Sequence, residues 1–393
     1  MEKIGIYGGT FNPPHIGHFR AAYYAREALG LDRVLMLPDK EAPHKVVPGD
    51  SPAPEHRLEM VRLGLDGMGV EASGLSLERE GPSYAWQTVR QVRCLYPDAD
   101  LYFLMGSDML ESFPDWLYPE RILKDAALAV FCRGDKGEAD RLEEAKTRVE
   151  ALGGRVVLLN NPITEISSTQ LRRMLIFRCA GDFLPERVEE YIQVRNLYGT
   201  GQNFRHLKEA ELEKVVVSLL KPGRVAHVLG CRDTAVALAR HYGVNETDAA
   251  RSALLHDITK ALDGPLQLTL CRSYGTMLDD FSQKNPKTLH ALTGSLVAER
   301  IFGENEAVVS AIRCHTTGKA DMNTLEKILY VADYMEPNRD FPGVERLREL
   351  AWTDITQALK LGLEMTLAML REQKREISPE SREALSYLEN CGQ

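Results

Sequence analysis

The chain has 393 residues and a formal net charge of -9. This length is long for one domain and suits two domains of about 200 residues, each with its own core. Both halves are acidic, with 24 basic against 30 acidic residues up to Tyr198 and 24 against 27 after it. Proteins that bind nucleic acid normally carry a positive face, so we expect no nucleic-acid partner.

The cysteines and the apolar segments indicate the compartment. Seven cysteines are scattered along the chain, and none are spaced C-x-x-C, so the sequence indicates neither a disulfide framework nor a zinc ribbon. No apolar run approaches the roughly 18 residues that a membrane span requires. We therefore expect a cytoplasmic protein without membrane association, which binds small anions in local positive pockets.

The string GGTFNPPHIGH joins a predicted strand, KIGIY, to a predicted helix, FRAAYYAREAL. Gly8 and Gly9 allow the backbone to approach a bound group where a side chain would block it. His15 and His18 are three residues apart, so they fall on one face at the positive end of the helix dipole. The string predicts a phosphate site, and the alternative is an ordinary glycine turn with two surface histidines.

Further apolar runs, bounded by turn residues, predict buried strands. These runs lie at residues 33–38, 99–106, 127–133 and 155–161, with an amphipathic helix at 55–65 and further helical segments between them. The alternation predicts an α/β fold, a doubly wound, Rossmann-like parallel sheet with ligands at the carboxyl ends of the strands.

Two polar residues follow predicted strands. Lys45 comes after the second strand, where a lysine can reach a phosphate as a point charge, although a solvated loop lysine is the alternative. Asp108 follows the strand at 99–106. It is placed to be a helix N-cap, an acceptor for ribose hydroxyls, or both.

The string ISSTQLRR begins another predicted helix. Ser167, Ser168 and Thr169 supply capping hydroxyls and exposed N–H groups, and Arg172 lies one turn further on the same side. The string predicts a second anion pocket, with a plain capped surface helix as the alternative.

Together, GGTFNPPHIGH and ISSTQLRR resemble the paired motifs of the nucleotidyltransferase superfamily. Their residues are most similar to those of the bacterial nicotinate-nucleotide adenylyltransferase family. The resemblance covers residues 1–198. It implies transfer of AMP from ATP to nicotinate mononucleotide with Mg²⁺, giving deamido-NAD and pyrophosphate. A coenzyme A precursor adenylyltransferase and a cytidylyltransferase remain alternatives.

The resemblance also implies roles for individual residues. The catalytic groups would be His15 and His18 on the ATP phosphates, Arg172 on the departing pyrophosphate, and Lys45 as added charge. Ser83, Tyr84 and Trp116 would hold the nicotinate ring and its carboxylate. The full implied substrate-binding set is Gly8, Gly9, Thr10, Phe11, Ser83, Tyr84, Asp108, Trp116, Ser167, Ser168 and Thr169.

The segment GTGQN interrupts both the apolar periodicity and the alternation of strands and helices, so residues 199–205 are predicted to be a linker. From residue 206 to 393 the pattern is helical, and strand signals vanish. We therefore expect an all-α second domain.

Histidines and aspartates recur in or at the end of apolar helical stretches of this second domain. They are His227, His256, Asp257, His290, His315 and Asp333. A polar group on an apolar face is costly unless it is hydrogen-bonded or bound to a metal. A core histidine with a hydrogen-bond partner explains any one of them, whereas the whole series predicts a shared metal centre.

Here the sequence resembles the HD phosphohydrolase superfamily, and HVLG, LLHDITK, RCHTTG and LEKILYVADYMEP are similar to the HD-domain symmetrical diadenosine tetraphosphate hydrolases. The match covers about residues 210–390. The resemblance implies one metal on His227, His256, Asp257 and Asp333, and a second on Asp257, His290 and His315. Both metals are expected to be iron or manganese. The implied phosphate contacts are Arg224, Lys260, Thr316, Thr317 and Arg339.

The sequence therefore predicts a bifunctional enzyme, an adenylyltransferase fused to a hydrolase that cleaves diadenosine tetraphosphate into two ADP. Two alternatives stay open for the second domain. It would either sense a nucleotide without turnover, or cleave another phosphorylated nucleotide such as a stringent-response alarmone. The sequence also leaves a homo-oligomer open.

Overall fold

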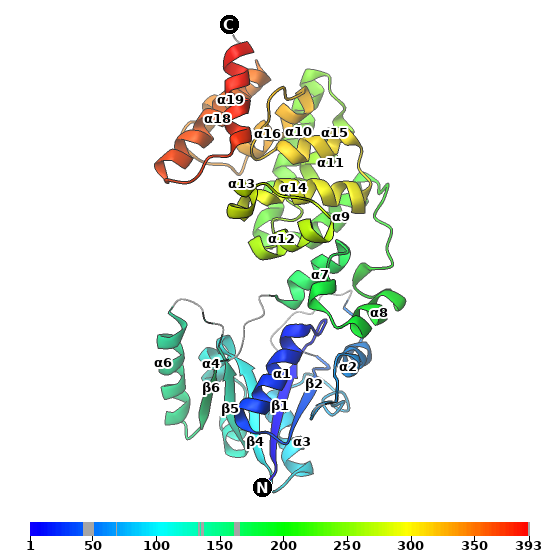
Figure 1. Cartoon of the computed structure of the whole chain (residues 1–393), viewed down its shortest axis with the longest axis vertical. Helices are drawn as coiled ribbons and strands as arrows, with labels where there is room; N and C mark the ends of the chain where they lie inside the picture. Colours follow the sequence, from blue (N-terminus) through cyan, green and yellow to red (C-terminus); the bar gives the residue numbers. More distant parts are fainter. Residues whose placement is uncertain (42–50, 68, 133, 135–136, 161–165, 392–393) are drawn as a thin grey trace. The chain divides into compact units, whose positions relative to one another are not determined.

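The computed structural model describes residues 1–393 except 42–50, 68, 133, 135–136, 161–165 and 392–393. The chain forms two compact units, Met1–Gln202 and Asn203–Gln393 (Figure 1). Within the described ranges, no helix is both long and apolar enough to cross a membrane.

The first unit contains a six-stranded sheet in the order β3-β2-β1-β4-β5-β6, and every neighbouring pair is parallel. The strands are β1 (Lys3–Gly9), β2 (Arg33–Pro38), β3 (Val70–Ala72), β4 (Asp100–Gly106), β5 (Ala126–Phe131) and β6 (Val156–Leu159). The predicted α/β class with a parallel sheet is confirmed. The sequence did not predict β3, whose three residues are too few for a recognisable pattern.

Apolar side chains cover both faces of this sheet. In β2, Val34 and Met36 belong to one buried cluster, whereas Leu35 and Leu37 belong to another. Successive residues of a strand point to opposite faces, so a continuously apolar strand requires helices on both sides. The helices are α1 (Ile16–Leu29), α2 (Pro54–Leu63), α3 (Ala85–Leu95), α4 (Ser107–Ser112), α5 (Pro119–Asp125), α6 (Glu138–Ala151), α7 (Ser168–Ile176) and α8 (Glu186–Val194).

The strand order reverses at β1, which lies between β2 and β4. In an open parallel sheet, ligands bind at the carboxyl ends of the strands beside such a reversal. The turn that follows β1 therefore occupies the expected ligand-binding edge.

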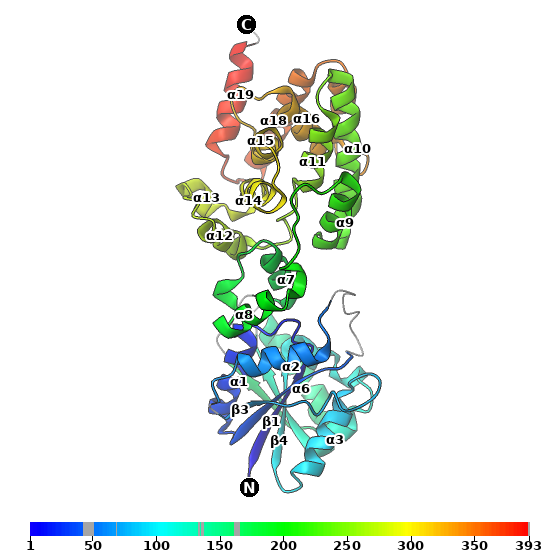
Figure 2. The same cartoon turned by 90° about the vertical axis from the view of Figure 1, so that its right-hand side faces the viewer.

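The second unit is built from helices, as predicted, and its described residues contain no strand (Figures 1 and 2). The helices of this unit are α9 (Glu209–Leu219), α10 (Val225–Tyr242), α11 (Glu246–Leu255), α12 (Gly264–Ser273), α13 (Asp280–Lys284), α14 (Leu289–Val297), α15 (Glu306–Cys314), α16 (Thr324–Met335), α17 (Val344–Ala351), α18 (Ile355–Glu372) and α19 (Pro379–Cys391). Helices α10, α11, α15 and α16 pack together. Of the predicted metal ligands, His227 lies in α10 and Asp333 in α16, whereas His256 and His315 directly follow α11 and α15.

Side-chain caps fix where several of these helices begin. The side chains of Asn245, Asp263, Asn305, Asn323 and Asp354 each accept a hydrogen bond from a backbone N–H of the first turn. Such a cap satisfies an N–H group that the helix itself leaves without a partner, and it contributes about 1 kcal/mol. The local sequence therefore fixes where α11, α15 and α16 begin, whereas α10 and α14 begin without such a cap.

Candidate functional site

The two predicted histidines of the first unit lie against each other at the start of α1. Their ring centroids are 3.7 Å apart, and the backbone N–H of His15 donates to Nδ1 of His18 at 3.2 Å. In the neutral ring of His18, the proton is then carried by Nε2, which becomes a hydrogen-bond donor. Burial lowers the pKa of His15 to about 4, so this ring is also neutral near pH 7.

The turn before these histidines borders an open cavity. A Cβ atom built on Gly8 would meet no heavy atom within 4 Å, and both Gly8 and Gly9 line the cavity. Thr10 lines it as well. The Phe11 side chain, in contrast, is buried, and its ring packs edge-on against His18 with centroids 5.0 Å apart. The glycines therefore leave room for a ligand, and the buried Phe11 ring holds His18 by packing against it.

Arg57 of α2 holds this turn in place, and sequence reasoning missed it. Its guanidinium is buried and donates to the carbonyl oxygens of Thr10 and Asp39, each at 2.6 Å. These carbonyls belong to the segments after β1 and β2. In the sequence, Arg57 lies in an amphipathic helix and has no signal that separates it from a solvated arginine.

The start of α7 contacts the turn after β1. Ser168 Oγ donates to the carbonyl oxygen of Pro13 at 3.0 Å, and Arg172 Nη1 donates to the carbonyl oxygen of Asn12 at 2.7 Å. Arg172 Nη2 donates to Thr169 Oγ1 at 3.1 Å. The structure therefore brings together the two motifs that the sequence singled out separately.

Ser167 is the N-cap of α7, and its hydroxyl accepts from the backbone N–H of Gln170 at 3.2 Å. The first N–H groups of a helix have no partner within the helix and lie at the positive end of its dipole. The N–H groups of Ser168 and Thr169 are therefore available to an anion held between α7 and the histidine turn.

The cavity beside the turn is polar on one side and apolar on the other. It has an empty volume of about 870 Å³, including its open mouth. Trp116 lies on the apolar side and packs against Phe113, with ring centroids 5.3 Å apart. The lining residues are Gly8, Gly9, Thr10, Asp39, Ser83, Tyr84, Ala85, Thr88, Phe103, Leu104, Met109, Trp116 and Leu117.

The predicted residues Ser83 and Tyr84 lie at the start of α3, which opens into this cavity. Tyr84 is the N-cap, and Ala85 is the first helical residue. Ser83 Oγ accepts from the backbone N–H of Lys40 at 2.9 Å, which joins this segment to the end of β2. The helix start therefore presents backbone N–H groups to a ligand in the cavity.

Two further predictions have different outcomes. Asp108 is exposed in the first turn of α4, and the N-cap of that helix is Gly106, so the predicted N-cap at Asp108 is wrong. The helix begins at Ser107, directly after the end of β4 and two residues earlier than an N-cap at Asp108 implies. Lys45 lies outside the described residues, so its proposed charge stays a prediction.

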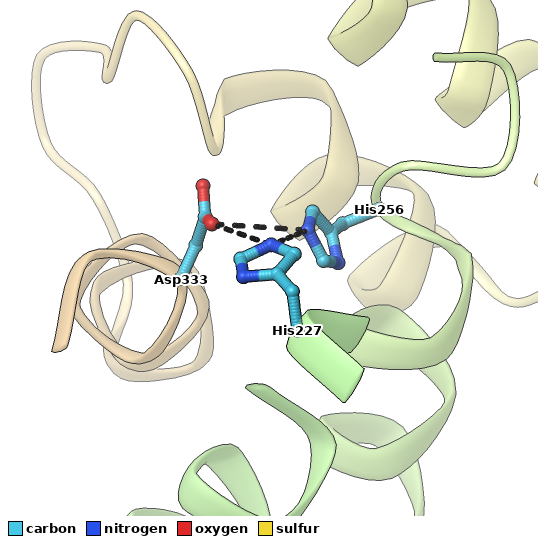
Figure 3. A group of neighbouring side chains, drawn as sticks. All are labelled: His227, His256 and Asp333. Carbon is cyan, nitrogen blue, oxygen red and sulfur yellow. Dashed lines mark hydrogen bonds and ion pairs between the residues drawn. The ribbon is translucent and has the colours of Figure 1, made fainter. Parts of the chain in front are cut away.

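Three of the predicted metal ligands meet where α10, the end of α11 and α16 come together (Figure 3). Nε2 of His227 lies 3.1 Å from Asp333 Oδ1 and 3.3 Å from Nε2 of His256. Nε2 of His256 lies 3.9 Å from Oδ1 of Asp333. All three side chains point toward one position.

Asp257 lies between these residues and the remaining two histidines. One carboxylate oxygen is 3.5 Å from Nε2 of His256, and the other is 3.6 Å from Nε2 of His290 and 3.9 Å from Nε2 of His315. Burial would raise the pKa of the carboxyl group, but His256, Lys260 and His290 hold it well below its ordinary value. The six predicted ligands therefore form one cluster with the Asp257 carboxylate at its centre.

Each of the four imidazole rings is oriented by an acceptor at Nδ1. The acceptors are the backbone carbonyls of Ala253 (2.7 Å, from His256), Lys287 (3.0 Å, from His290) and Ile312 (2.7 Å, from His315), and the carboxylate of Glu336 (3.1 Å, from His227). With Nδ1 protonated, the lone pair of each Nε2 faces the cluster.

This arrangement fits metal ions. Lone pairs of nitrogen and carboxylate oxygen that face one another within 4 Å repel unless a cation lies among them. Burial lowers the pKa of His290 to about 4 and that of His315 to about 3, which keeps both rings neutral, as a metal ligand must be.

All the predicted phosphate contacts except Thr317 lie around this cluster. Arg224 pairs with one oxygen of Asp257, and Lys260 Nζ lies 3.1 Å from the other. Arg339 Nη2 donates to Asp333 Oδ1 at 2.6 Å. These cationic groups would face an anionic substrate at the centre.

Thr316 and Thr317 differ although they are neighbours. Thr316 Oγ1 lies 3.1 Å from Nε2 of both His290 and His315, inside the cluster. The Thr317 hydroxyl instead donates to Glu380 Oε2 of α19 at 2.7 Å. The structure therefore brings Thr316 to the centre and directs Thr317 to the C-terminal helix.

Two family models match this chain, Cytidylyltransferase-like over residues 6–174 and HD domain over residues 224–338. A probable nicotinate-nucleotide adenylyltransferase of Listeria monocytogenes is 37% identical over 199 residues, which cover 50% of this chain and 98% of that protein. The corresponding protein of Gloeobacter violaceus is 38% identical over 200 residues, which cover 50% of this chain and 96% of that protein.

Among solved structures, one from Clostridium acetobutylicum is described as a predicted HD superfamily hydrolase involved in NAD metabolism. It is 34% identical, with a TM-score of 0.46, and the match covers 47% of this chain and 98% of that chain. Nicotinic acid mononucleotide adenylyltransferase of Plasmodium falciparum, complexed with NaAD, is 19% identical, with a TM-score of 0.41. That match covers 51% of this chain and 99% of that chain.

Proposed function

We propose that the first half of the chain, which belongs to the nicotinate-nucleotide adenylyltransferase family, transfers AMP from ATP to nicotinate mononucleotide. The observation that carries this proposal is the contact between the two motifs, in which Arg172 and Ser168 bind the carbonyls of Asn12 and Pro13. This contact supports a single anion site that the histidine turn and the start of α7 would share.

In the proposed reaction, a phosphate oxygen of nicotinate mononucleotide attacks the α-phosphorus of ATP. The bond from that phosphorus to the oxygen bridging the α- and β-phosphates breaks, and pyrophosphate leaves. His18 would donate from Nε2 to the reacting phosphate, while Arg172 and the start of α7 hold the pyrophosphate. Mg²⁺ bound with ATP would supply further positive charge. Catalysis of this kind comes mainly from alignment and from preorganised charge.

The cavity supports nicotinate mononucleotide as the acceptor. A pyridine ring would find a surface for stacking and contact at Trp116 and Phe103, which both line the cavity. Its carboxylate would then face the N–H groups at the start of α3, at the positive end of the helix dipole. An amide in place of the carboxylate would gain less from this dipole.

A panel of acceptors and donors tests this assignment. The full chain is incubated with ATP or CTP and with nicotinate mononucleotide, nicotinamide mononucleotide or phosphopantetheine, and initial rates of pyrophosphate release are measured. We expect ATP with nicotinate mononucleotide to give the highest kcat/KM, by at least about tenfold over each other pair. A higher value with phosphopantetheine or with CTP would contradict the proposal.

For the second half, which contains an HD domain, we propose metal-dependent cleavage of diadenosine tetraphosphate into two ADP. The convergence of the other five predicted metal ligands around Asp257 carries the hydrolase assignment, and the motif resemblance carries the choice of dinucleotide. Bound divalent ions would lower the pKa of a coordinated water. Water then adds to one of the two middle phosphorus atoms, and the bond to the central bridging oxygen breaks.

The cationic groups around the cluster support a substrate with several phosphates. Arg224 and Lys260 lie beside Asp257, and Arg339 lies beside Asp333. In the folded chain they are paired with the ligand carboxylates, and they would turn toward phosphate oxygens when ions neutralise those carboxylates. A substrate with a single phosphate would use fewer of them.

Product analysis tests this second activity. The full chain, loaded with Mn²⁺ or Fe²⁺ under anaerobic conditions, is incubated with diadenosine tetraphosphate, and nucleotides are separated by chromatography. We expect ADP as the sole product. AMP together with ATP would contradict symmetrical cleavage, and tight binding without cleavage would favour a nucleotide-sensing module.

A further inference from the structure

We propose that Glu336 is a positioning residue for the metal ion that His227 binds, an inference that rests on the proposed metal-dependent function of the second unit. Glu336 directly follows α16, and its side chain is 1% exposed. Its Oε1 atom lies 3.1 Å from Nδ1 of His227. The opposite ring nitrogen of His227 is the one that faces Asp333 and His256.

The acceptor at His227 differs in kind from the other three. His256, His290 and His315 are oriented by neutral backbone carbonyls, whereas His227 is oriented by a carboxylate. A carboxylate accepts a stronger hydrogen bond and makes the ring a better electron donor toward a metal. Glu336 therefore makes His227 a distinct ligand within the cluster.

The surrounding residues hold the Glu336 carboxylate in this position. Oε2 accepts from the backbone N–H and from the side-chain amide of Asn338, both at 2.8 Å. Gly230 of α10 leaves the necessary space, because a Cβ atom there would lie 2.5 Å from Oε2 and 3.1 Å from Asn338 Nδ2. The position of Glu336 depends on the absence of a side chain at Gly230.

The charge of Glu336 also suits a cation at the far side of the ring. Among the described residues, His227 is the ion-pair partner of this buried carboxylate, and Arg339 acts on it through its charge without an ion pair. A buried carboxylate is stabilised by positive charge near it. A metal ion on Nε2 of His227 would add to this charge through the imidazole.

Titration of the full chain with Mn²⁺ tests the inference. The chelator-treated protein, as wild type, Glu336→Gln and Gly230→Ala, is titrated by calorimetry, and free Mn²⁺ is followed by electron paramagnetic resonance. Glu336→Gln removes the charge at nearly constant volume, and Gly230→Ala displaces the carboxylate without removing it. For both variants we expect one of two Mn²⁺ equivalents to bind about 10- to 100-fold more weakly.

Glu326→Gln is the matched control. Glu326 is also a carboxylate that is 1% exposed and belongs to α16, but it pairs with Lys319 at 2.6 Å. We expect this variant to lower the Tm and to leave both Mn²⁺ affinities within about threefold of wild type. Equal weakening by Glu326→Gln, or unchanged affinities in Glu336→Gln and Gly230→Ala, would overturn the inference.

The outcome for Glu336 is separable from that of the hydrolase proposal. Wild-type protein that binds Mn²⁺ in a Glu336-dependent way and leaves the dinucleotide intact would overturn the proposed substrate while supporting the role of Glu336. Wild-type protein that binds no Mn²⁺ would overturn the role of Glu336.

Discussion

Arg172 Nη1 donates a hydrogen bond of 2.7 Å to the backbone carbonyl oxygen of Asn12, 160 positions earlier in the chain. The same guanidinium binds Thr169 through Nη2. One side chain therefore fixes the start of α7 against the turn after β1, and its positive charge lies where both segments can contact an anion.

Replacement of Arg172 is expected to impair transfer severely. Arg172→Met should lower kcat/KM for ATP by at least about 10²-fold, because both the charge and the contact with Asn12 are lost. Arg172→Lys keeps the charge but loses the forked geometry, so we expect an intermediate value. Arg187→Met, at an exposed position of α8, removes the same charge and is the control. Initial rates of pyrophosphate release measure the effect, and a loss below about threefold in Arg172→Met would contradict it.

His18 is expected to be the donor to the reacting phosphate. His18→Ala should lower turnover by at least about 10²-fold, the usual effect of losing one preorganised donor. His18→Gln retains an N–H donor and should lose less. The control is His56→Ala, because in the described part of the chain the hydrogen bond of the His56 ring joins it to Tyr191 of α8 at 2.8 Å and not to the turn. Unchanged turnover in His18→Ala would remove the proposed role.

Much of the fold follows from local sequence patterns. The strands β2, β4, β5 and β6 were predicted because each is a short apolar run, which a parallel sheet buried on both faces requires. β1 was predicted from its two apolar residues Ile4 and Ile6. β3 was missed because it has three residues and pairs only with β2. The N-cap at Asp108 was wrong because β4 continues into α4 without an intervening turn.

The site was predictable where a motif carries it and unpredictable where tertiary contacts create it. The six predicted metal ligands stand out in the sequence because each interrupts an apolar helical pattern. Arg57 and Glu336 look like solvated charges, and only folding buries them against Thr10 and His227. The partners of Thr316 and Thr317 could not be told apart either, because the difference depends on where α19 packs.

The pKa of His15 should be measurable directly. Burial lowers this pKa to about 4, as it does that of His290, so in the full chain labelled with ¹³C-histidine the His15 resonance must first be assigned by its absence from the spectrum of His15→Gln. This resonance should titrate near pH 4. The unfolded state has a histidine pKa of about 6.5 and binds more protons between pH 4 and 6.5. Stability should therefore fall by up to about 3 kcal/mol as the pH drops through this window. A titration midpoint above pH 6 would contradict burial of the ring.

Variants at Asp257 and at His315 are expected to differ in the number of metal ions that the protein retains. Asp257 lies between both groups of ligands, so Asp257→Asn should lose both ions and lower hydrolysis by at least about 10²-fold. His315→Ala removes a ligand from one group and should retain about one ion per chain. Elemental analysis of the purified variants measures this, with Asp321→Asn, whose carboxylate accepts from Tyr387, as the control. Two ions retained in Asp257→Asn would contradict a bridging carboxylate.

Trp116 should affect the acceptor more than ATP, because it lines the apolar side of the cavity. Loss of an aromatic stacking partner costs on the order of 1 kcal/mol beyond its area, so Trp116→Ala should raise KM for nicotinate mononucleotide by about tenfold. KM for ATP should change by less than about threefold, and Trp116→Phe should restore most of the loss. Trp352→Ala, an exposed tryptophan of the second unit, is the control. Equal increases in both KM values would show that Trp116 supports the fold of the site and does not contact the acceptor.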